Sequence, residues 1–255
     1  GTIARSGGKV VKNVAGYDLQ KLFTGSLGTL GIIAQATFRL HPCPQETLLL
    51  SLGAADVHDL ARLARSLLDS TVVTSGIQAR VQSQNQVFLD VRLEGLRATN
   101  ESQAAQVRKA AQPWRLAEVE TKAWPAREDL WKGTASAAVC KVSFLPAQLG
   151  ELCSRLYGWT SPGKTHWQGA LQAFGVGWLR FENETSDALM ETIQATRKFL
   201  ESTGGSLVVL RAPLELKARL DAWGDVGDAL PLMRRVKEQF DPRGILSPGR
   251  FVGGI

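Results

Sequence analysis

Between residues 46 and 211 the hydrophobic pattern switches repeatedly between the period of a strand and the period of a helix. Residues 86–93 alternate apolar and polar side chains, which predicts a strand with one buried and one solvated face. Residues 54–70 instead place their apolar side chains on one side of a 3.6-residue period, which predicts an amphipathic helix. By the same criteria we expect further strands at 47–52, 76–81, 138–144, 167–174, 176–182 and 206–210, and further helices at 102–111, 146–156 and 186–203.

The order strand, helix, strand, strand, helix occurs twice in this list. Two such halves predict a split antiparallel sheet with helices on one face, which is the ferredoxin-like layout. The fold class is therefore expected to be α+β. Residues 112–135 fit neither period and hold Trp114, Trp124 and Trp131, which we expect to act as wedges between layers, with a stacking site for a ligand or partner as the alternative.

Before this region, residues 7–33 form a polar, glycine-dense opening that runs into an apolar stretch. Asp18 is expected to cap a short helix at 19–24, and the residues 31–40 read as a strand. Gly25, Gly28 and Gly31 follow at a spacing of three. Glycine is favoured where φ is positive or where the backbone lies against something that leaves no room for Cβ, so the spacing predicts close contact with a ligand or another segment.

The C-terminal region predicts one helix, at 229–240. Its expected inward face consists of Leu232, Met233, Val236 and Phe240. Asp241-Pro242 ends this helix, because the residue before proline is driven away from the helical region. The segment His41-Pro42-Cys43-Pro44 marks a boundary near the other end of the chain.

Two separated phrases carry a family resemblance. Residues 12–33, KNVAGYDLQKLFTGSLGTLGII, and residues 240–251, FDPRGILSPGRF, together resemble the FAD-linked oxidases of the vanillyl-alcohol-oxidase type. Leu27, where most members carry Glu, makes the first phrase most similar to the second of the FAD-binding flavoprotein subunits of bacterial glycolate oxidase. Ser247 stands where the family usually has Asn.

The resemblance implies a domain plan and a cofactor. Residues 1–44 would be the end of an FAD-binding domain whose earlier part the chain lacks, 45–213 a duplicated ferredoxin-like cap, and 214–255 a C-terminal segment that returns to the FAD-binding domain. The first residue, Gly1 rather than Met, fits a fragment. FAD would be held by Gly25, Ser26, Leu27, Gly28, Thr29, Gly31, Ile32, Ile33 and Ser247.

The histidines limit what chemistry we expect of the chain. Removing a hydride from a 2-hydroxy acid needs a base or metal for the hydroxyl proton. Only His41, His58 and His166 are present, at no metal-ligand spacing, and residues 178–213 lack the family's His-rich cap motif. We therefore assign no catalytic and no metal residue, while Arg180 and Arg211 remain candidates to hold a carboxylate, with surface ion pairing as the simpler account of both.

The resemblance then implies an FAD-binding subunit of a glycolate oxidase-like complex that oxidises a 2-hydroxy acid. Its expected partners are a second FAD-linked flavoprotein subunit and an iron–sulfur subunit. Two alternatives stay open, namely a self-sufficient FAD-linked 2-hydroxy-acid dehydrogenase and a flavin-free structural subunit of such a complex.

Composition adds limits to this picture. With 255 residues, 44% of them hydrophobic, the chain is long enough for one large core or two smaller ones. The net charge of +6 comes from basic residues interleaved with acids, which argues against nucleic-acid binding. No apolar run is long enough for a membrane span. Three cysteines are too few for a disulfide framework, so we expect a cytoplasmic protein that lies at the inner membrane, if at all, through its complex.

Overall fold

The chain forms two compact units, of which unit 1 comprises residues 1–41 and 225–255 and unit 2 residues 42–224. The computed structural model describes residues 2–8, 17–83, 86–114, 116–119, 124–133, 136–160 and 165–255. Residues 12–16 of the first family phrase lie outside these ranges, while all nine predicted flavin-site residues lie within them.

Unit 2 contains an eight-stranded sheet in the order β4-β1-β3-β2-β6-β7-β5-β8. Every pair of neighbouring strands is antiparallel. The strands are β1 (Glu46–Ala54), β2 (Gly76–Ser83), β3 (Gln86–Gly95), β4 (Ala117–Glu118), β5 (Ala137–Ser143), β6 (His166–Gln172), β7 (Val176–Glu182) and β8 (Ser206–Arg211).

The sheet is built from two halves with the same topology. Each half places its own strands in the order fourth, first, third, second, and the two second strands, β2 and β6, pair where the halves meet. Their register sets Gln78 opposite Gln172 and Val81 opposite Gly169. An antiparallel sheet with helical crossovers confirms the predicted α+β class.

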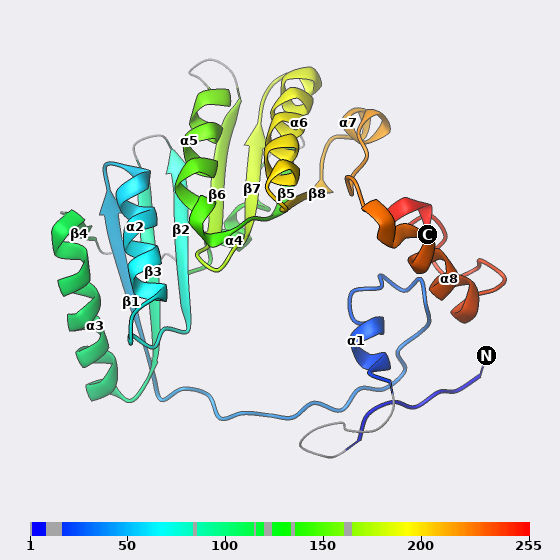
Figure 1. Cartoon of the computed structure of the whole chain (residues 1–255), viewed down its shortest axis with the longest axis horizontal. Helices are drawn as coiled ribbons and strands as arrows, with labels where there is room; N and C mark the ends of the chain where they lie inside the picture. The colour runs from blue at the N-terminus through cyan, green and yellow to red at the C-terminus, as the bar shows by residue number, and fades with distance from the viewer. Residues whose placement is uncertain are drawn as a thin grey trace. The chain divides into compact units, whose positions relative to one another are not determined.

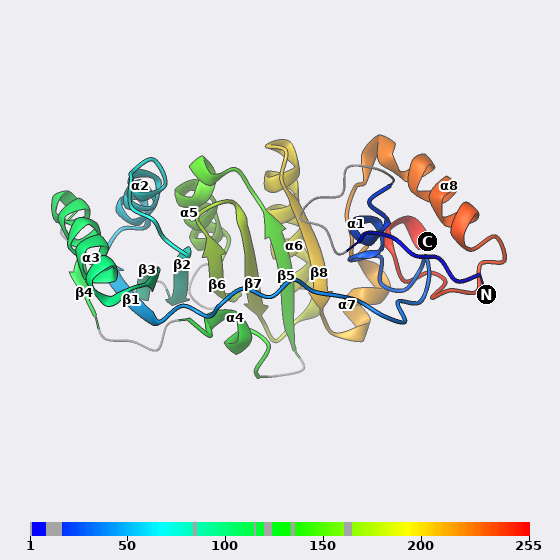
Figure 2. The same cartoon turned by 90° about the horizontal axis from the view of Figure 1, so that it is seen from below.

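Four helices cover one face of this sheet: α2 (Val57–Leu68), α3 (Arg97–Ala111), α5 (Leu149–Trp159) and α6 (Ser186–Ser202). They lie together on that face in both views, whereas the short α4 (Ala126–Asp129) lies on the opposite face (Figures 1 and 2). The core between helices and sheet is continuous through both halves, with side chains such as Leu60, Leu89, Leu152 and Phe181 fully buried. Unit 2 therefore has a hydrophobic core made from its own residues.

Some predicted bounds were wrong. Helix α3 begins at Arg97 rather than at 102, and the short strand β4 was not predicted. Helix α7 (Leu214–Arg219) was also missed, and it belongs with unit 2 because Leu216 and Leu220 are buried in the core of that unit. Unit 2 ends at residue 224, whereas the domain plan that the resemblance implies ends the cap at 213.

The second face of β3 also differs from the prediction of a solvated face. Asp90, which alternates away from the helix-covered core, is only 1% exposed. Its carboxylate accepts hydrogen bonds from Arg80 Nε at 2.8 Å and Nη2 at 3.0 Å and from Ser51 Oγ at 2.7 Å. A buried charge is stable only when paired in this way. The alternation therefore predicted correctly which side chains share a face of β3, but not that the second face is buried at Asp90.

The tryptophans of the 112–135 region have structural contacts. The Trp124 ring lies against Gly76, where an added Cβ would come 2.5 Å from a ring carbon. Trp114 packs against the core of unit 2 and lies 5.6 Å from the Arg62 guanidinium. These contacts agree with the interpretation of Trp114 and Trp124 as wedges, whereas Trp131 is 39% exposed.

Unit 1 contains helices α1 (Leu19–Phe23) and α8 (Leu230–Phe240) with the short 3-10 helices η3 (Gly227–Ala229) and η4 (Val252–Gly254). The Phe23 and Phe240 rings meet edge to face at 5.2 Å between centroids. The Asp18 side chain makes no capping hydrogen bond, because it pairs with Lys21 at 2.8 Å instead.

Two further predictions for unit 1 were wrong for one physical reason. Residues 31–40 form no strand, and no residue of α8 is buried. In both places apolar side chains face solvent, with exposed fractions of 86% for Ile32, 79% for Phe38 and 57% for Leu232. A strand needs a neighbour to accept its hydrogen bonds and an amphipathic helix needs a surface to cover. The described residues of unit 1 supply no strand neighbour and cover the apolar face of α8 only in part.

The three cysteines allow a direct test of the two-unit description. All are free thiols, with Cys43 exposed and Cys140 and Cys153 buried. Burial raises the pKa of both buried thiols from 9.0 to about 12, and the thiolate is the reactive form. We expect Ellman's reagent to label one thiol per native chain at pH 8 and three after unfolding, and rapid labelling of more than one in the native chain would contradict the described core.

Candidate functional site

The candidate site lies in unit 1, where the glycine turn (residues 25–29) meets the C-terminal loop (residues 245–249). A Cβ added to Gly28, whose φ is +80°, would come 3.3 Å from the Ser247 hydroxyl oxygen. The two residues are more than two hundred positions apart in the chain, yet both were predicted as flavin contacts. The structure brings these parts of the two family phrases together.

Both loops contain a residue in the left-handed region. Leu27 has a φ of +54° and Ser247 a φ of +44°, and they are the non-glycine residues with positive φ among the described positions. Such conformations cost roughly 1–3 kcal/mol each and persist only where the surroundings hold them. The two strained positions therefore mark these loops as candidates for a binding function.

The turn also offers backbone donors. Within the part of the chain that the structure describes, the N–H groups of Leu27 and Gly28 donate to no protein acceptor, whereas the N–H of Thr29 closes the turn on Ser26 O at 3.0 Å. Consecutive N–H groups in a turn with positive φ form a concave site for anionic oxygens. The geometry suits a phosphate or another anion at this turn.

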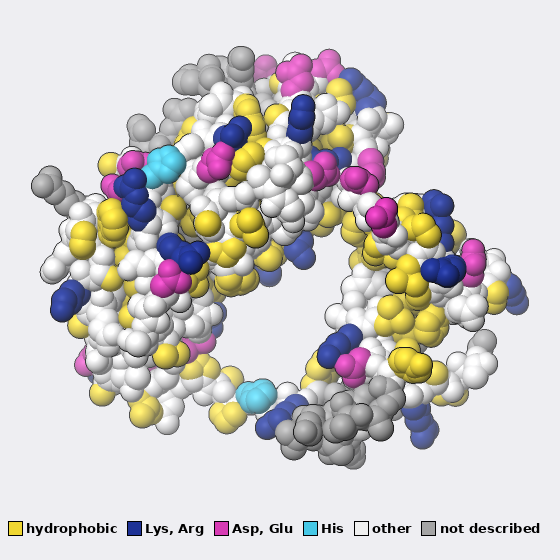
Figure 3. Space-filling model, in the orientation of Figure 1, with side chains coloured by type: hydrophobic (Ala, Val, Ile, Leu, Met, Phe, Trp, Pro, Cys, Tyr) yellow, Lys and Arg dark blue, Asp and Glu magenta, His cyan; other side chains and the backbone are white. Residues whose placement is uncertain are grey.

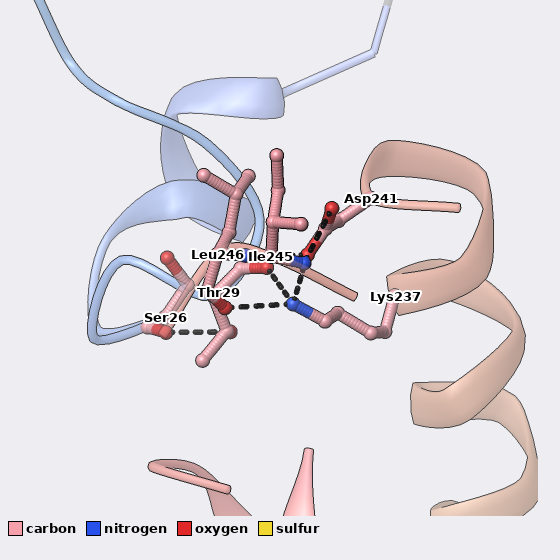
Figure 4. A network of polar contacts seen from close by, with 6 residues as sticks. All are labelled: Ser26, Thr29, Lys237, Asp241, Ile245 and Leu246. Atoms are coloured by element: carbon pink, nitrogen blue, oxygen red, sulfur yellow. Dashed lines mark hydrogen bonds and ion pairs between the residues drawn. The ribbon is translucent and has the colours of Figure 1, made fainter. Parts of the chain in front are cut away.

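Lys237 of α8 connects the glycine turn with the C-terminal loop (Figure 4). Its ammonium donates to Thr29 O at 2.8 Å, to Leu246 O at 2.8 Å and to Asp241 Oδ2 at 2.6 Å. The side chain is only 12% exposed. Because an ammonium group has three N–H donors, these acceptors use its full capacity.

The Asp241 carboxylate holds the other end of this network. Its Oδ1 accepts from Ile245 N at 3.2 Å and its Oδ2 from Leu246 N at 2.8 Å. The hydrogen bond from Lys237 and these backbone N–H groups lower the pKa of Asp241 below its ordinary value of 3.8, since each of them favours the charged form. At neutral pH the Asp241 carboxyl group is therefore ionised.

The predicted site residues divide by environment. Ser26 and Thr29 are buried, and the Thr29 hydroxyl donates to Ser26 O at 2.7 Å, so it supports the turn from inside. The absence of a side chain at Gly31 is explained by the Phe23 ring, since an added Cβ would come 2.6 Å from it. A Cβ at Gly25 would meet nothing within 4 Å.

The two remaining predicted residues, Ile32 and Ile33, are exposed. They follow the turn in an extended segment that lacks regular secondary structure. Their side chains are therefore accessible to a cofactor, but no packing contact holds them in one position.

The arginines considered as carboxylate clamps have other roles in unit 2. Arg180 is buried and donates to Leu130 O at 3.0 Å, to Lys132 O and to Glu182. Arg211 donates to Trp131 O at 2.8 Å. Both side chains thus fix the 130–132 segment, which sequence patterns could not reveal because the acceptors are backbone carbonyls.

The histidines remain separated. His41 and His166 are exposed, and His58 Nε2 lies 2.9 Å from Ser154 Oγ. Across the described ranges, no three His, Cys, Asp or Glu side chains gather closely enough to hold a metal ion. Among the helices of those same ranges, none combines the length and apolar character needed to cross a membrane.

Sequence reasoning missed Lys237 and Asp241 as parts of the site. Their i, i+4 spacing on a basic helix indicates a surface ion pair, and Asp241 was interpreted only as the end of the helix. The available signal was the position of Asp241 inside the FDP phrase, directly before the loop that carries Ser247.

The C-terminal loop of the candidate site lies in a segment that matches a known family. Residues 224–251 match the family model described as FAD linked oxidases, C-terminal domain. This range contains α8, the Lys237–Asp241 pair and Ser247, and it therefore covers one half of the candidate site.

Similar sequences agree with the family match. The chain is 36% identical over 78 residues to glycolate oxidase subunit GlcD of Bacillus subtilis, a stretch covering 31% of this chain and 17% of that protein. It is 48% identical over 46 residues to glycolate oxidase subunit GlcE of Escherichia coli, covering 18% and 13%. A D-lactate dehydrogenase of Archaeoglobus fulgidus is 24% identical over 99% of this chain and 62% of its own length. The chain thus matches less than two thirds of each of these relatives.

Among solved structures, an alkyldihydroxyacetonephosphate synthase matches the fold with a TM-score of 0.62 at 15% identity, over 89% of this chain and 48% of that chain. At this identity the match shows a shared fold alone, and it agrees with the α+β class. The matched segment and these relatives make the chain similar to the FAD-linked oxidases, a family whose name gives FAD as the cofactor.

The residues present fit such a cofactor. The unused N–H groups of Leu27 and Gly28 suit nucleotide oxygens, and the side chain that Gly28 lacks leaves the turn open beside Ser247. No acidic side chain lies among the residues of the glycine turn, because Leu27 replaces the usual Glu.

Proposed function

We propose that unit 1 is the C-terminal part of an FAD-binding domain and that unit 2 is the cap domain of the same flavoprotein. The observation that carries this proposal is the meeting of the two strained loops at Gly28 and Ser247. Leu27 and Gly28 would donate their N–H groups to nucleotide oxygens, and Ser247 would lie beside them with its hydroxyl. FAD, when bound, supplies the two-electron acceptor of the reaction.

The surface of unit 1 supports the assignment to part of a larger domain. Hydrophobic side chains gather at the surface over α1 and α8 (Figure 3), where Leu22 is 41% and Leu232 57% exposed. They line a shallow groove together with Val236 and Phe240. Each large apolar side chain left in water forgoes roughly 1.5–3 kcal/mol of burial free energy. We propose that the polypeptide by which the relatives exceed this chain covers these residues and pairs with residues 31–40.

For the whole protein we propose the role of FAD-binding subunit in a glycolate oxidase-like complex, with a 2-hydroxy acid as substrate. The names of the similar glycolate oxidase subunits and of the similar D-lactate dehydrogenase support this substrate class. The proposed partners are a second FAD-linked flavoprotein subunit and an iron–sulfur subunit that receives the electrons. The free thiols agree with the cytoplasm, where the complex would lie at the inner membrane.

The test compares the purified full-length protein with the reconstituted complex. Loaded with FAD and given glycolate or D-lactate, the protein alone should reduce no dye, because the residues that the structure describes assemble no metal site for the hydroxyl proton. Addition of the flavoprotein and iron–sulfur partners should produce dye reduction. The same assay with Gly28→Val in the complex then reports whether this subunit's flavin matters.

The runner-up is a self-sufficient FAD-linked dehydrogenase, for which the long match to a D-lactate dehydrogenase speaks. Its signature would be dye reduction by the isolated protein that His166→Ala abolishes, since His166 is the exposed histidine at a strand end of the sheet. That result would overturn the subunit role while leaving the FAD site in place. A flavin-free structural subunit would instead show normal complex assembly and no flavin.

A further inference from the structure

Lys237 donates hydrogen bonds to both the glycine turn and the C-terminal loop. Its ammonium contacts a carbonyl of the glycine turn, Thr29 O, and a carbonyl of the C-terminal loop, Leu246 O, both at 2.8 Å. The Thr29 carbonyl follows Gly28 directly, and the Leu246 carbonyl precedes Ser247. Each contact is therefore one residue away from a position of the candidate flavin site.

Asp241 fixes Lys237 and the C-terminal loop at the same time. Its carboxylate is 4% exposed and accepts from Lys237 Nζ and from two backbone N–H groups of the loop. Hydrogen bonds with an ionised partner are about twice as strong as neutral ones. The result is a closed set of contacts that holds the backbone at residues 29 and 245–246, next to Leu27 and Ser247 with their positive φ.

We propose that Lys237 is a positioning residue for FAD, which sets the spacing between the glycine turn and the C-terminal loop without contacting the flavin. Its three donors are all used by protein acceptors, so none remains for a cofactor oxygen. Asp241 acts through Lys237 and through the loop. This inference rests on the proposed FAD site and adds the residues that shape it.

The decisive variants are Lys237→Met, which keeps most of the aliphatic stem and removes the ammonium, and Asp241→Asn. Each should weaken FAD binding by the full-length protein by roughly 10- to 100-fold, as measured by flavin fluorescence titration. Because both residues belong to one network, the double variant should cost little more than the worse single variant.

Hydrogen exchange gives a local readout that a general loss of stability would not imitate. In Lys237→Met the amides of the glycine turn and of Ile245–Ser247 should exchange faster, while amides in the middle of α8 keep their protection. Arg234→Met is the matched control, because Arg234 lies on the same helix and donates to a backbone carbonyl, Gly253 O at 3.3 Å, but is exposed. It should change neither FAD affinity nor exchange at the two loops.

Three results would overturn one claim or the other. Unchanged FAD affinity in Lys237→Met, with faster loop exchange, would overturn the positioning role and leave the FAD site intact. Unchanged loop exchange would show that the ammonium does not hold the loops, and would likewise overturn it. Failure of the unmodified full-length protein to bind FAD would overturn the proposed function itself, and with it this inference.

Discussion

Gly28→Val is expected to lose flavin from the full-length protein while the protein stays folded. Valine at a φ of +80° is strained because its branched Cβ collides with the backbone, and this Cβ would also point to the Ser247 hydroxyl, 3.3 Å away. Both effects move the N–H groups proposed to hold the nucleotide. FAD affinity should fall by roughly tenfold or more, as measured by the flavin retained after gel filtration and by fluorescence titration.

Gly204→Val is the matched control for backbone strain. Gly204 also has a φ of +80°, but it lies in unit 2 just after the C-cap of α6, and an added Cβ there would meet nothing within 4 Å. The control should show a similar loss of stability with flavin binding unchanged. Equal flavin loss in both variants, or normal flavin content in Gly28→Val, would remove the glycine turn from the proposed site.

The second large effect concerns the stability of unit 2. Asp90→Ala should lower the free energy of unfolding by about 3–5 kcal/mol, because it leaves the buried Arg80 guanidinium without its carboxylate. Arg80 and Asp90 side chains are 4% and 2% exposed, so water cannot replace the lost partner. Urea unfolding followed by circular dichroism measures the change.

An exposed ion pair in the same unit provides the comparison. Asp59 pairs with Arg62 at 2.8 Å, and their side chains are 31% and 59% exposed. Asp59→Ala should cost at most about 1 kcal/mol. A double variant, Arg80→Met with Asp90→Leu, should recover much of the stability lost in Asp90→Ala. Similar small losses for Asp90 and Asp59 would show that the second face of the sheet is open to water.

The strands of unit 2 could be predicted because buried and less buried side chains alternate along them with a period of two residues. In β7, Leu179 and Phe181 face the helices, and the strand begins and ends at the predicted residues. The same periodicity could not tell that Asp90 is buried. Its burial depends on Arg80 from the neighbouring strand and on Ser51 from β1, and the strand order that joins them is a property of the whole sheet.

Unit 1 shows the opposite relation between sequence and structure. The apolar stretch at 31–40 and the amphipathic pattern of α8 are strong local signals, yet the strand does not form and the helix face stays exposed. A local sequence pattern predicts which side chains an element could bury. Whether those side chains become buried depends on tertiary contacts. The exposed Ile32 and Leu232 fit the proposal that another polypeptide segment covers these surfaces.

The sequence indicated the two loops of the candidate site, but not the Lys237–Asp241 pair that holds them. The glycine spacing drew attention to Gly28, because a positive φ favours glycine. Ser247 was predicted only from the family resemblance of the FDP phrase. Lys237 leaves no such trace, since its partners are carbonyl groups of Thr29 and Leu246 that any residue carries. Gly31 lies against the Phe23 ring, which is the predicted alternative of close contact with another segment of the chain.

The most direct test of the central claim, that this protein holds FAD at the glycine turn and the C-terminal loop, is the visible absorbance spectrum of the purified full-length protein. We expect flavin bands at close to one FAD per chain, released as free FAD on denaturation and absent from Gly28→Val. A colourless, folded protein that takes up no FAD when it is added would contradict the account.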